Sequence, residues 1–149
     1  MKHFSIVMIG GFALLIGTVF LEAQEKKEVS PVCPVSGKDI DKTHSLKHLE
    51  ANVYFCCPNC PKAFEANTEK FAPKANHQVV VTKQAKQVKC PISGQPLNPE
   101  MATPVSDVKV EFCCDKCLAK VKAAEGEKQL QLVFSDAAFQ KGFEVKKAE

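Results

Sequence analysis

The sequence predicts an α+β fold made of two small units, each built from a cysteine-containing turn, a β-hairpin and a helix. Three observations support this prediction. The 149 residues contain eight cysteines, all of them lie in a segment that occurs twice, and each copy has patterns typical of turn, strand and helix in that order. The chain also has no tryptophan and only one tyrosine, so something besides a large apolar core must stabilise the units.

The chain begins with a segment typical of an export signal. Lys2 and His3 precede an uncharged apolar run from Phe4 to Leu21, and Ala23 offers a small residue for cleavage. We therefore predict a signal peptide over residues 1–23, and a periplasmic or secreted location. A retained membrane anchor is the alternative, because about 18 apolar residues are enough to span a bilayer.

The charge pattern argues against a nucleic-acid partner. The chain has 20 lysine or arginine residues and 17 acidic residues, and the basic residues are all lysine. This mild positive excess favours solubility. Without arginine, the chain lacks the bidentate side chain that reads guanine or grips phosphate. We predict no nucleic-acid contact, membrane contact only if residues 1–23 are retained, and a flexible charged leader over residues 24–30.

An ungapped repeat relates residues 33–60 to residues 90–117 at an offset of 57. Nine aligned positions are identical and include every cysteine, in the pairs Cys33/Cys90, Cys56/Cys113, Cys57/Cys114 and Cys60/Cys117. We call the first members of these pairs the first quartet and their partners the second quartet. The repeat predicts a first unit over residues 31–86 and a second unit over residues 87–147.

Histidine does not follow the repeat. The aligned residues are apolar, with Met101, Val105 and Phe134 opposite His44, His48 and His77. A histidine ligand needed in both units would recur as the cysteines do. We therefore expect these histidines to be surface or packing residues.

Local patterns predict the elements of each unit in order. Cys-Pro-Val-Ser-Gly at 33–37 and Cys-Pro-Ile-Ser-Gly at 90–94 predict tight turns through their proline and glycine. Val110 and Phe112 alternate with charged residues and predict a strand that ends at Cys113, and residues 53–55 repeat this strand.

A helix is predicted after each cysteine pair. Pro58 suits the first turn of one helix, while Asp115 is suited to start the other and Gly126 to end it. The tails predict an apolar strand and a short helix in each unit, at 79–81 and 82–86 and at 130–134 and 135–141. Strand-like residues follow at 87–89 and 143–146.

The quartets favour a soft metal ion. Thiolates bind Zn²⁺ and Cu⁺, and structural sites often take one ligand from a turn and others from a helix start. Adjacent strand residues point to opposite faces, so Cys57, next to Cys56, is either a fourth ligand or a neighbour of the site. The same choice applies to Cys114. A structural zinc ion supplies roughly 10–16 kcal/mol, enough to decide whether so small a unit folds.

These residues resemble the YHS and TRASH domains, which are small treble-clef-like metal-binding modules. The first unit matches through Cys33-Pro-Val-Ser-Gly-Lys, Val-Tyr-Phe-Cys56-Cys57-Pro-Asn-Cys60, Ala63-Phe64 and residues 67–71. The second unit is more divergent and matches through Cys90-Pro-Ile-Ser-Gly and Val-Glu-Phe-Cys113-Cys114-Asp-Lys-Cys117. Ser36 and Ser93 stand where related zinc units often have a second cysteine in the turn.

The resemblance implies the ligands and the role. It assigns one ion to Cys33, Cys56 and Cys60, and a second ion to Cys90, Cys113 and Cys117. It also implies a role in heavy-metal sensing, trafficking or resistance, with metal ions and another metal-handling protein as partners.

Two other functions fit the cysteines. An even number of cysteines in an exported chain is typical of disulfides, although a vicinal Cys56–Cys57 bond would be strained. Cys57-Pro-Asn-Cys60 resembles the motif of thioredoxin-like thiol–disulfide oxidoreductases, but the second copy reads Cys114-Asp-Lys-Cys117 and no βαβ pattern surrounds either motif. No other catalytic motif is recognisable, so we predict a non-catalytic protein.

Overall fold

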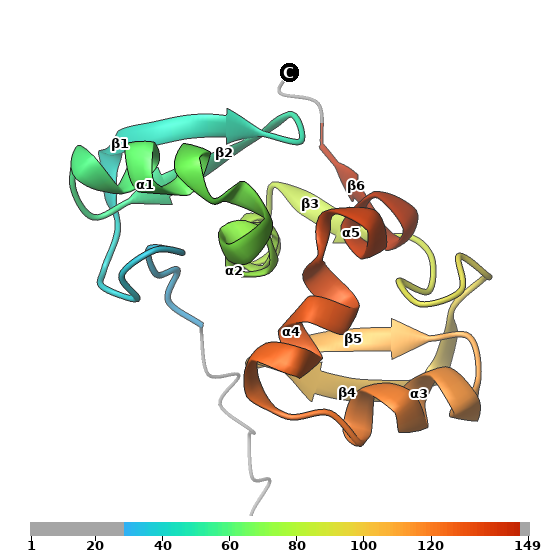
Figure 1. Cartoon of the computed structure of the whole chain (residues 1–149). Helices are drawn as coiled ribbons and strands as arrows, with labels where there is room; N and C mark the ends of the chain where they lie inside the picture. The colour runs from blue at the N-terminus through green and yellow to red at the C-terminus, as the bar shows by residue number, and fades with distance from the viewer. Residues whose placement is uncertain (1–28, 147–149) are drawn as a thin grey trace, which may run out of the picture.

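The computed structural model describes residues 29–146 (Figure 1). The predicted signal peptide, residues 1–23, and most of the predicted leader, residues 24–30, lie outside the described residues. The described part contains five helices and six strands, and the strands form three two-stranded antiparallel sheets. This confirms the α+β class. No helix in residues 29–146 combines the length and the hydropathy needed to cross a membrane.

The two units begin with the same turn and the same hairpin. Gly37 and Gly94 have φ angles of +72° and +76°, a conformation that glycine adopts without a steric penalty, and each N–H donates to the carbonyl of the turn cysteine at 2.8 and 2.7 Å. Each hairpin turns through two residues with positive φ, as two-residue hairpin turns of type I′ require. These strands are β1 (Asp41–His48) with β2 (Ala51–Phe55), and β4 (Asn98–Val105) with β5 (Val108–Phe112).

A helix follows each hairpin, as predicted, and further elements complete each unit. The first unit continues with α1 (Asn59–Ala66), α2 (Thr68–Val81) and β3 (Ala85–Gln87). The second unit continues with α3 (Asp115–Lys122), α4 (Gly126–Phe134), α5 (Asp136–Gly142) and β6 (Phe143–Val145).

The tails differ from the sequence prediction. Residues 79–81 are the end of α2 and residues 130–134 are the end of α4, so both predicted strands were wrong. Short apolar runs do not distinguish a strand from a buried helical turn, and here Val79 and Phe134 are fully buried in helices. Gly126 begins α4 instead of ending α3. The predicted helix at 82–86 was also wrong, because the chain turns there and enters β3.

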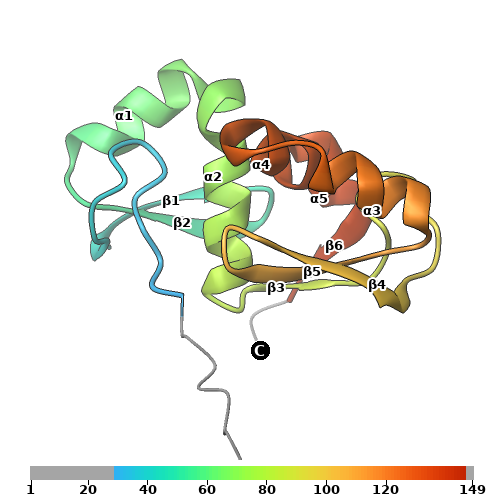
Figure 2. The same ribbon diagram turned by 90° about the horizontal axis from the view of Figure 1, so that it is seen from below.

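The units are joined by a shared sheet and a helix contact. Strands β3 and β6 pair with each other, and α2 lies beside α4 in both views (Figures 1 and 2). The predicted boundary between residues 86 and 87 falls inside β3. One continuous apolar core therefore spans both units, and its largest fully buried side chains include Phe55, Phe64, Phe112, Phe134 and Phe139.

Candidate metal centres

The first quartet lies where the turn at 33–37 meets the junction between β2 and α1. The Sγ atoms of Cys33, Cys56 and Cys60 all lie within 4.8 Å of one another, and those of Cys56 and Cys60 are 3.6 Å apart. Buried Phe55 fixes the end of β2, and buried Phe64 shares one face of α1 with Cys60. Packing of the strand and helix therefore brings sulfurs from distant positions together. We call these three residues the first triad.

The second quartet repeats the arrangement. Cys90, Cys113 and Cys117, the second triad, also have Sγ atoms within 4.8 Å of one another, and the Cys113–Cys117 distance is 3.7 Å. Buried Val121 lies one turn after Cys117 on α3. The ends of β2 and β5, which lead into the quartets, lie at opposite ends of the molecule (Figure 1). The geometry thus gives two separate sites.

The sulfur spacing fits a shared metal ion. A tetrahedral zinc–thiolate site with Zn–S bonds of about 2.3 Å places its sulfurs about 3.8 Å apart. The Cys56–Cys60 and Cys113–Cys117 sulfur distances are 3.6 and 3.7 Å. A disulfide would need a distance near 2.05 Å, and all eight cysteines are free. Both triads are therefore close enough to bind a metal ion, while the spacing does not select one metal.

The fourth cysteine of each quartet lies beside the triad. The Sγ atom of Cys57 is 3.5 Å from that of Cys60, and the Sγ atom of Cys114 is 3.5 Å from that of Cys113. The two groups of mutually close sulfurs contain neither residue. Cys57 and Cys114 are thus neighbours of the triads in this conformation.

A serine hydroxyl contacts each triad. Ser36 Oγ lies 3.1 Å from the Cys56 sulfur, and Ser93 Oγ lies 3.1 Å from the Cys113 sulfur. These serines occupy the turn position where the family resemblance expects a second cysteine. A hydroxyl can donate a hydrogen bond to a thiolate, so each serine supports the charged form of the site without being a sulfur ligand.

The turn cysteines are more acidic than an ordinary cysteine thiol. Burial disfavours the Cys33 thiolate, but hydrogen bonds from the Ser36 hydroxyl and from nearby backbone N–H groups outweigh burial and lower its pKa from 9.0 to about 7. The same balance, with Ser93 as the hydroxyl donor, lowers the pKa of Cys90 to about 7. At neutral pH about half of the molecules therefore carry a thiolate at each turn cysteine before any ion binds.

The triad cysteines on the helices, Cys60 and Cys117, have raised pKa values. Burial and hydrogen bonds with the other thiols of the quartet raise the pKa of Cys60 above its usual range and that of Cys117 to about 12. A backbone hydrogen bond at the start of the helix is the main cause that lowers the pKa of Cys57, through Asn59, and of Cys114, through Cys117. Metal binding must therefore displace a proton from the helix cysteine of each triad.

One glutamine in each unit, not identified from the sequence, hydrogen-bonds the backbone around the cysteine site. Gln78 of α2 is buried; its Oε1 accepts from the Tyr54 N–H, and its Nε2 donates to the carbonyls of Tyr54 and Val32, each at 2.8 Å. Gln87 of β3 makes the equivalent contacts to Glu111 and Lys89. In both units the amide ties the outer edge of the hairpin to the residue before the turn cysteine.

No signal in the sequence pointed to these glutamines. The repeat aligns their partners, Tyr54 with Glu111 and Val32 with Lys89, but it aligns Gln78 with Ser135. The same backbone clamp is therefore made by non-equivalent residues from different elements.

Two of the histidines, His48 and His77, pack between the units, as expected of packing residues. His48 Nε2 lies 2.8 Å from Asp136 Oδ1, and His77 Nε2 lies 2.9 Å from the Ser106 carbonyl oxygen. In residues 29–146, the groups of potential metal ligands contain only cysteines.

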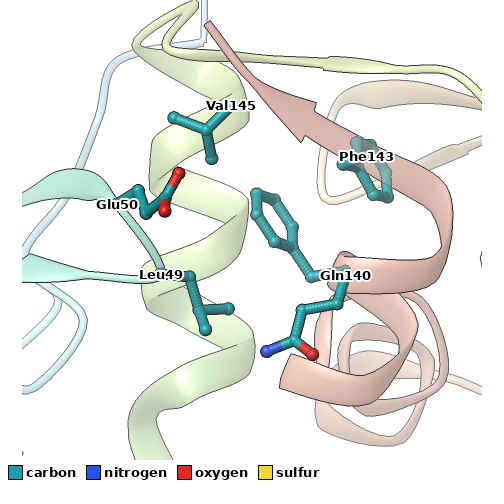
Figure 3. Close-up of a pocket in the computed structure, with 6 residues that line it drawn as sticks. Leu49, Glu50, Gln140, Phe143 and Val145 are labelled. Atoms are coloured by element: carbon teal, nitrogen blue, oxygen red, sulfur yellow. The ribbon is translucent and has the colours of Figure 1, made fainter. Parts of the chain in front are cut away.

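An open pocket of about 320 Å³ lies beside α5 (Figure 3). It is lined by Leu49, Glu50, Phe139, Gln140, Phe143 and Val145, and so by neither cysteine nor histidine.

Comparisons of the chain with models of protein families, with curated proteins and with solved structures found no significant match.

Proposed function

We propose that the protein is an exported, non-catalytic metal-binding protein that holds one thiophilic ion in each cysteine triad. The observation that carries the proposal is the convergence of three sulfurs, twice, from segments separated by more than twenty residues. Without a shared role, two units with different sequences would not be expected to keep the same three-sulfur cluster. The resemblance to YHS and TRASH domains supports the same ligand set.

The ion belongs to the zinc and copper class. Three thiolates with a hydroxyl beside them suit Zn²⁺ and Cu⁺ and disfavour hard cations such as Mg²⁺, which bind oxygen ligands. These sites, together with the predicted export signal, support a role in heavy-metal trafficking or resistance in the periplasm or outside the cell. Its partners are then metal ions and a further metal-handling protein.

Native mass spectrometry of the chain starting at residue 24, combined with thiol counting after denaturation, tests the proposal. Metal binding predicts two bound ions and eight titratable thiols. A disulfide-stabilised protein would instead carry no metal and no free thiols. Replacement of Cys60 by serine should remove one ion, and replacement of Cys117 should remove the other. A chain that stays metal-free after reduction and incubation with Zn²⁺ or Cu⁺ would contradict the proposal.

One observation favours a second candidate function, a thiol–disulfide oxidoreductase. The sulfurs of Cys57 and Cys60 lie 3.5 Å apart at the start of α1, and the pKa of Cys57 is lowered, as in active-site motifs of that class. In the second copy the sulfur of Cys114 also interacts with Cys117, but it lies 3.5 Å from Cys113, and aspartate replaces the proline of the motif. An oxidoreductase would reduce a test disulfide catalytically and lose that activity in the Cys57→Ser variant.

A further inference from the structure

Each quartet contains two overlapping sets of three sulfurs. One set is the triad, which includes the turn cysteine. The other set, which we call the junction set, consists of the three cysteines at the strand–helix junction. Its sulfurs are not all within 4.8 Å of one another in this conformation, so it can hold an ion only after the side chain of Cys57 or Cys114 moves. In the first junction set, Cys60 Sγ lies 3.6 Å from Cys56 and 3.5 Å from Cys57. In the second, Cys113 Sγ lies 3.5 Å from Cys114 and 3.7 Å from Cys117.

The two sets differ in one member, and that member differs in burial. The turn cysteines Cys33 and Cys90 are 1% and 0% exposed. The cysteines that replace them in the junction sets, Cys57 and Cys114, are partly exposed. An ion held by a triad therefore has one fully buried ligand, and an ion held by a junction set would have a partly exposed ligand in its place.

We propose that Cys57 and Cys114 are exchange ligands that replace the buried turn cysteine of each triad, so that a thiol-containing acceptor can take the ion. This inference rests on the metal-binding function proposed above. In the step, Cys57 Sγ binds the ion and loses its proton to solvent, while Cys33 Sγ releases the ion and takes up a proton. The sulfurs keep their electron pairs, so no oxidant or reductant is needed. Cys114 and Cys90 do the same at the second site.

The geometry argues against the other two roles for these cysteines. A permanent fourth ligand would lie about 3.8 Å from every sulfur of a tetrahedral site, but Cys57 and Cys114 fall outside the groups whose sulfurs are all within 4.8 Å. A cysteine without a role would not stay within 3.5 Å of a triad sulfur in both units while the residues that follow it change from Pro58 and Asn59 to Asp115 and Lys116.

Exchange through a neighbouring sulfur keeps the ion bound to protein ligands until the acceptor binds it. If a triad had to lose its ion directly to solvent, the rate of transfer would be set by dissociation and would not depend on the acceptor. With an exchange ligand, the acceptor binds an ion that is still held by the protein. The rate of transfer then rises with acceptor concentration, and this dependence is the property to measure.

The experiment follows transfer of Zn²⁺ from the loaded protein to a chromophoric chelator in a stopped-flow instrument, over a series of chelator concentrations. Four proteins are compared: the unaltered chain, the Cys57→Ser variant, the Cys114→Ser variant and the Asn59→Ser control. Asn59 is exposed in the same turn, so the control keeps every sulfur. Equilibrium affinity for Zn²⁺ is measured in parallel by competition.

The Cys57→Ser variant should still hold two ions with nearly unchanged affinity. Acceptor-dependent transfer from one of its sites should slow by about tenfold or more, which corresponds to roughly 1.4 kcal/mol in the activation barrier. The Cys114→Ser variant should slow the other site, and the control should slow neither.

Three results would overturn the inference or its premise. A loss of affinity of about a hundredfold in Cys57→Ser would make Cys57 a permanent ligand. An unchanged rate of Zn²⁺ transfer in both cysteine variants would show that Cys57 and Cys114 take no part in the exchange. An unaltered chain that binds no Zn²⁺ would instead refute the metal-binding function for this ion and, with it, the premise of the exchange step.

Discussion

Replacing Gln78 by alanine should loosen the first candidate metal site while leaving the second intact. The change removes three hydrogen bonds of 2.8 Å, one from the Tyr54 N–H and two to the carbonyls of Tyr54 and Val32. At a net value of about 1 kcal/mol per bond, the loss is roughly 3 kcal/mol. For a domain of this size, about 4 °C per kcal/mol converts this loss to a fall in Tm of about 12 °C.

The affinity for metal should fall at the same site, because Gln78 holds the residue before Cys33 against the strand that ends before Cys56. The matched variant is Gln87→Ala, which removes the equivalent clamp from the second unit. Thermal unfolding of the metal-free variants gives the stability, and Zn²⁺ competition gives the affinity of each site. A Tm within about 2 °C of the unaltered protein, or equal weakening of both sites by Gln78→Ala, would refute the clamp.

Three further predictions follow from the same contacts. Because the pKa values of Cys33 and Cys90 are about 7, thiolate absorbance of the metal-free protein should show two thiols ionising near neutral pH. The stability that these thiolates add should be fully present above pH 9 and lost as pH falls to about 7, when the folded thiols take up protons. Asp136→Ala removes an acceptor shared by two side chains of the first unit and should cost about 2 kcal/mol in urea unfolding. In Gly142→Ala the new methyl carbon would lie 2.8 Å from the backbone of the second cysteine turn, so Zn²⁺ competition should show weaker binding at the second site only.

The elements that repeat in the sequence were predictable because local chemistry specifies them. Proline and glycine specify the turn at 33–37, and the alternation of apolar and charged residues specifies the strand before Cys113. The same patterns specify the copies of these elements in the other unit. The convergence of the cysteines was also predictable, since their spacing around a turn and a helix start brings the sulfurs together, while the choice of three of the four came from the resemblance to YHS and TRASH domains.

The contacts between the units were not predictable in the same way. The tails lie in α2 and α4, whose apolar residues are buried against elements from the other unit. A short apolar run carries no mark of whether its partner will be a helix or a strand. The pairing of β3 with β6 and the clamp by Gln87 likewise depend on where distant segments meet, and no local pattern records that.

The shared architecture couples the two candidate metal sites through folding. A two-stranded hairpin is marginally stable by itself, and here each hairpin is completed by a core that both units supply. In the shared sheet Lys86 pairs with Glu144, and its neighbours Ala85 and Gln87 pair with Val145 and Phe143. The two units are therefore related by an approximate two-fold axis at this sheet. An ion that binds only the folded protein stabilises it, and in doing so it stabilises the core on which the other site is built. When the metal-free chain is partly unfolded, binding of one ion must therefore raise the affinity for the other, and by linkage the effect is equal in both directions.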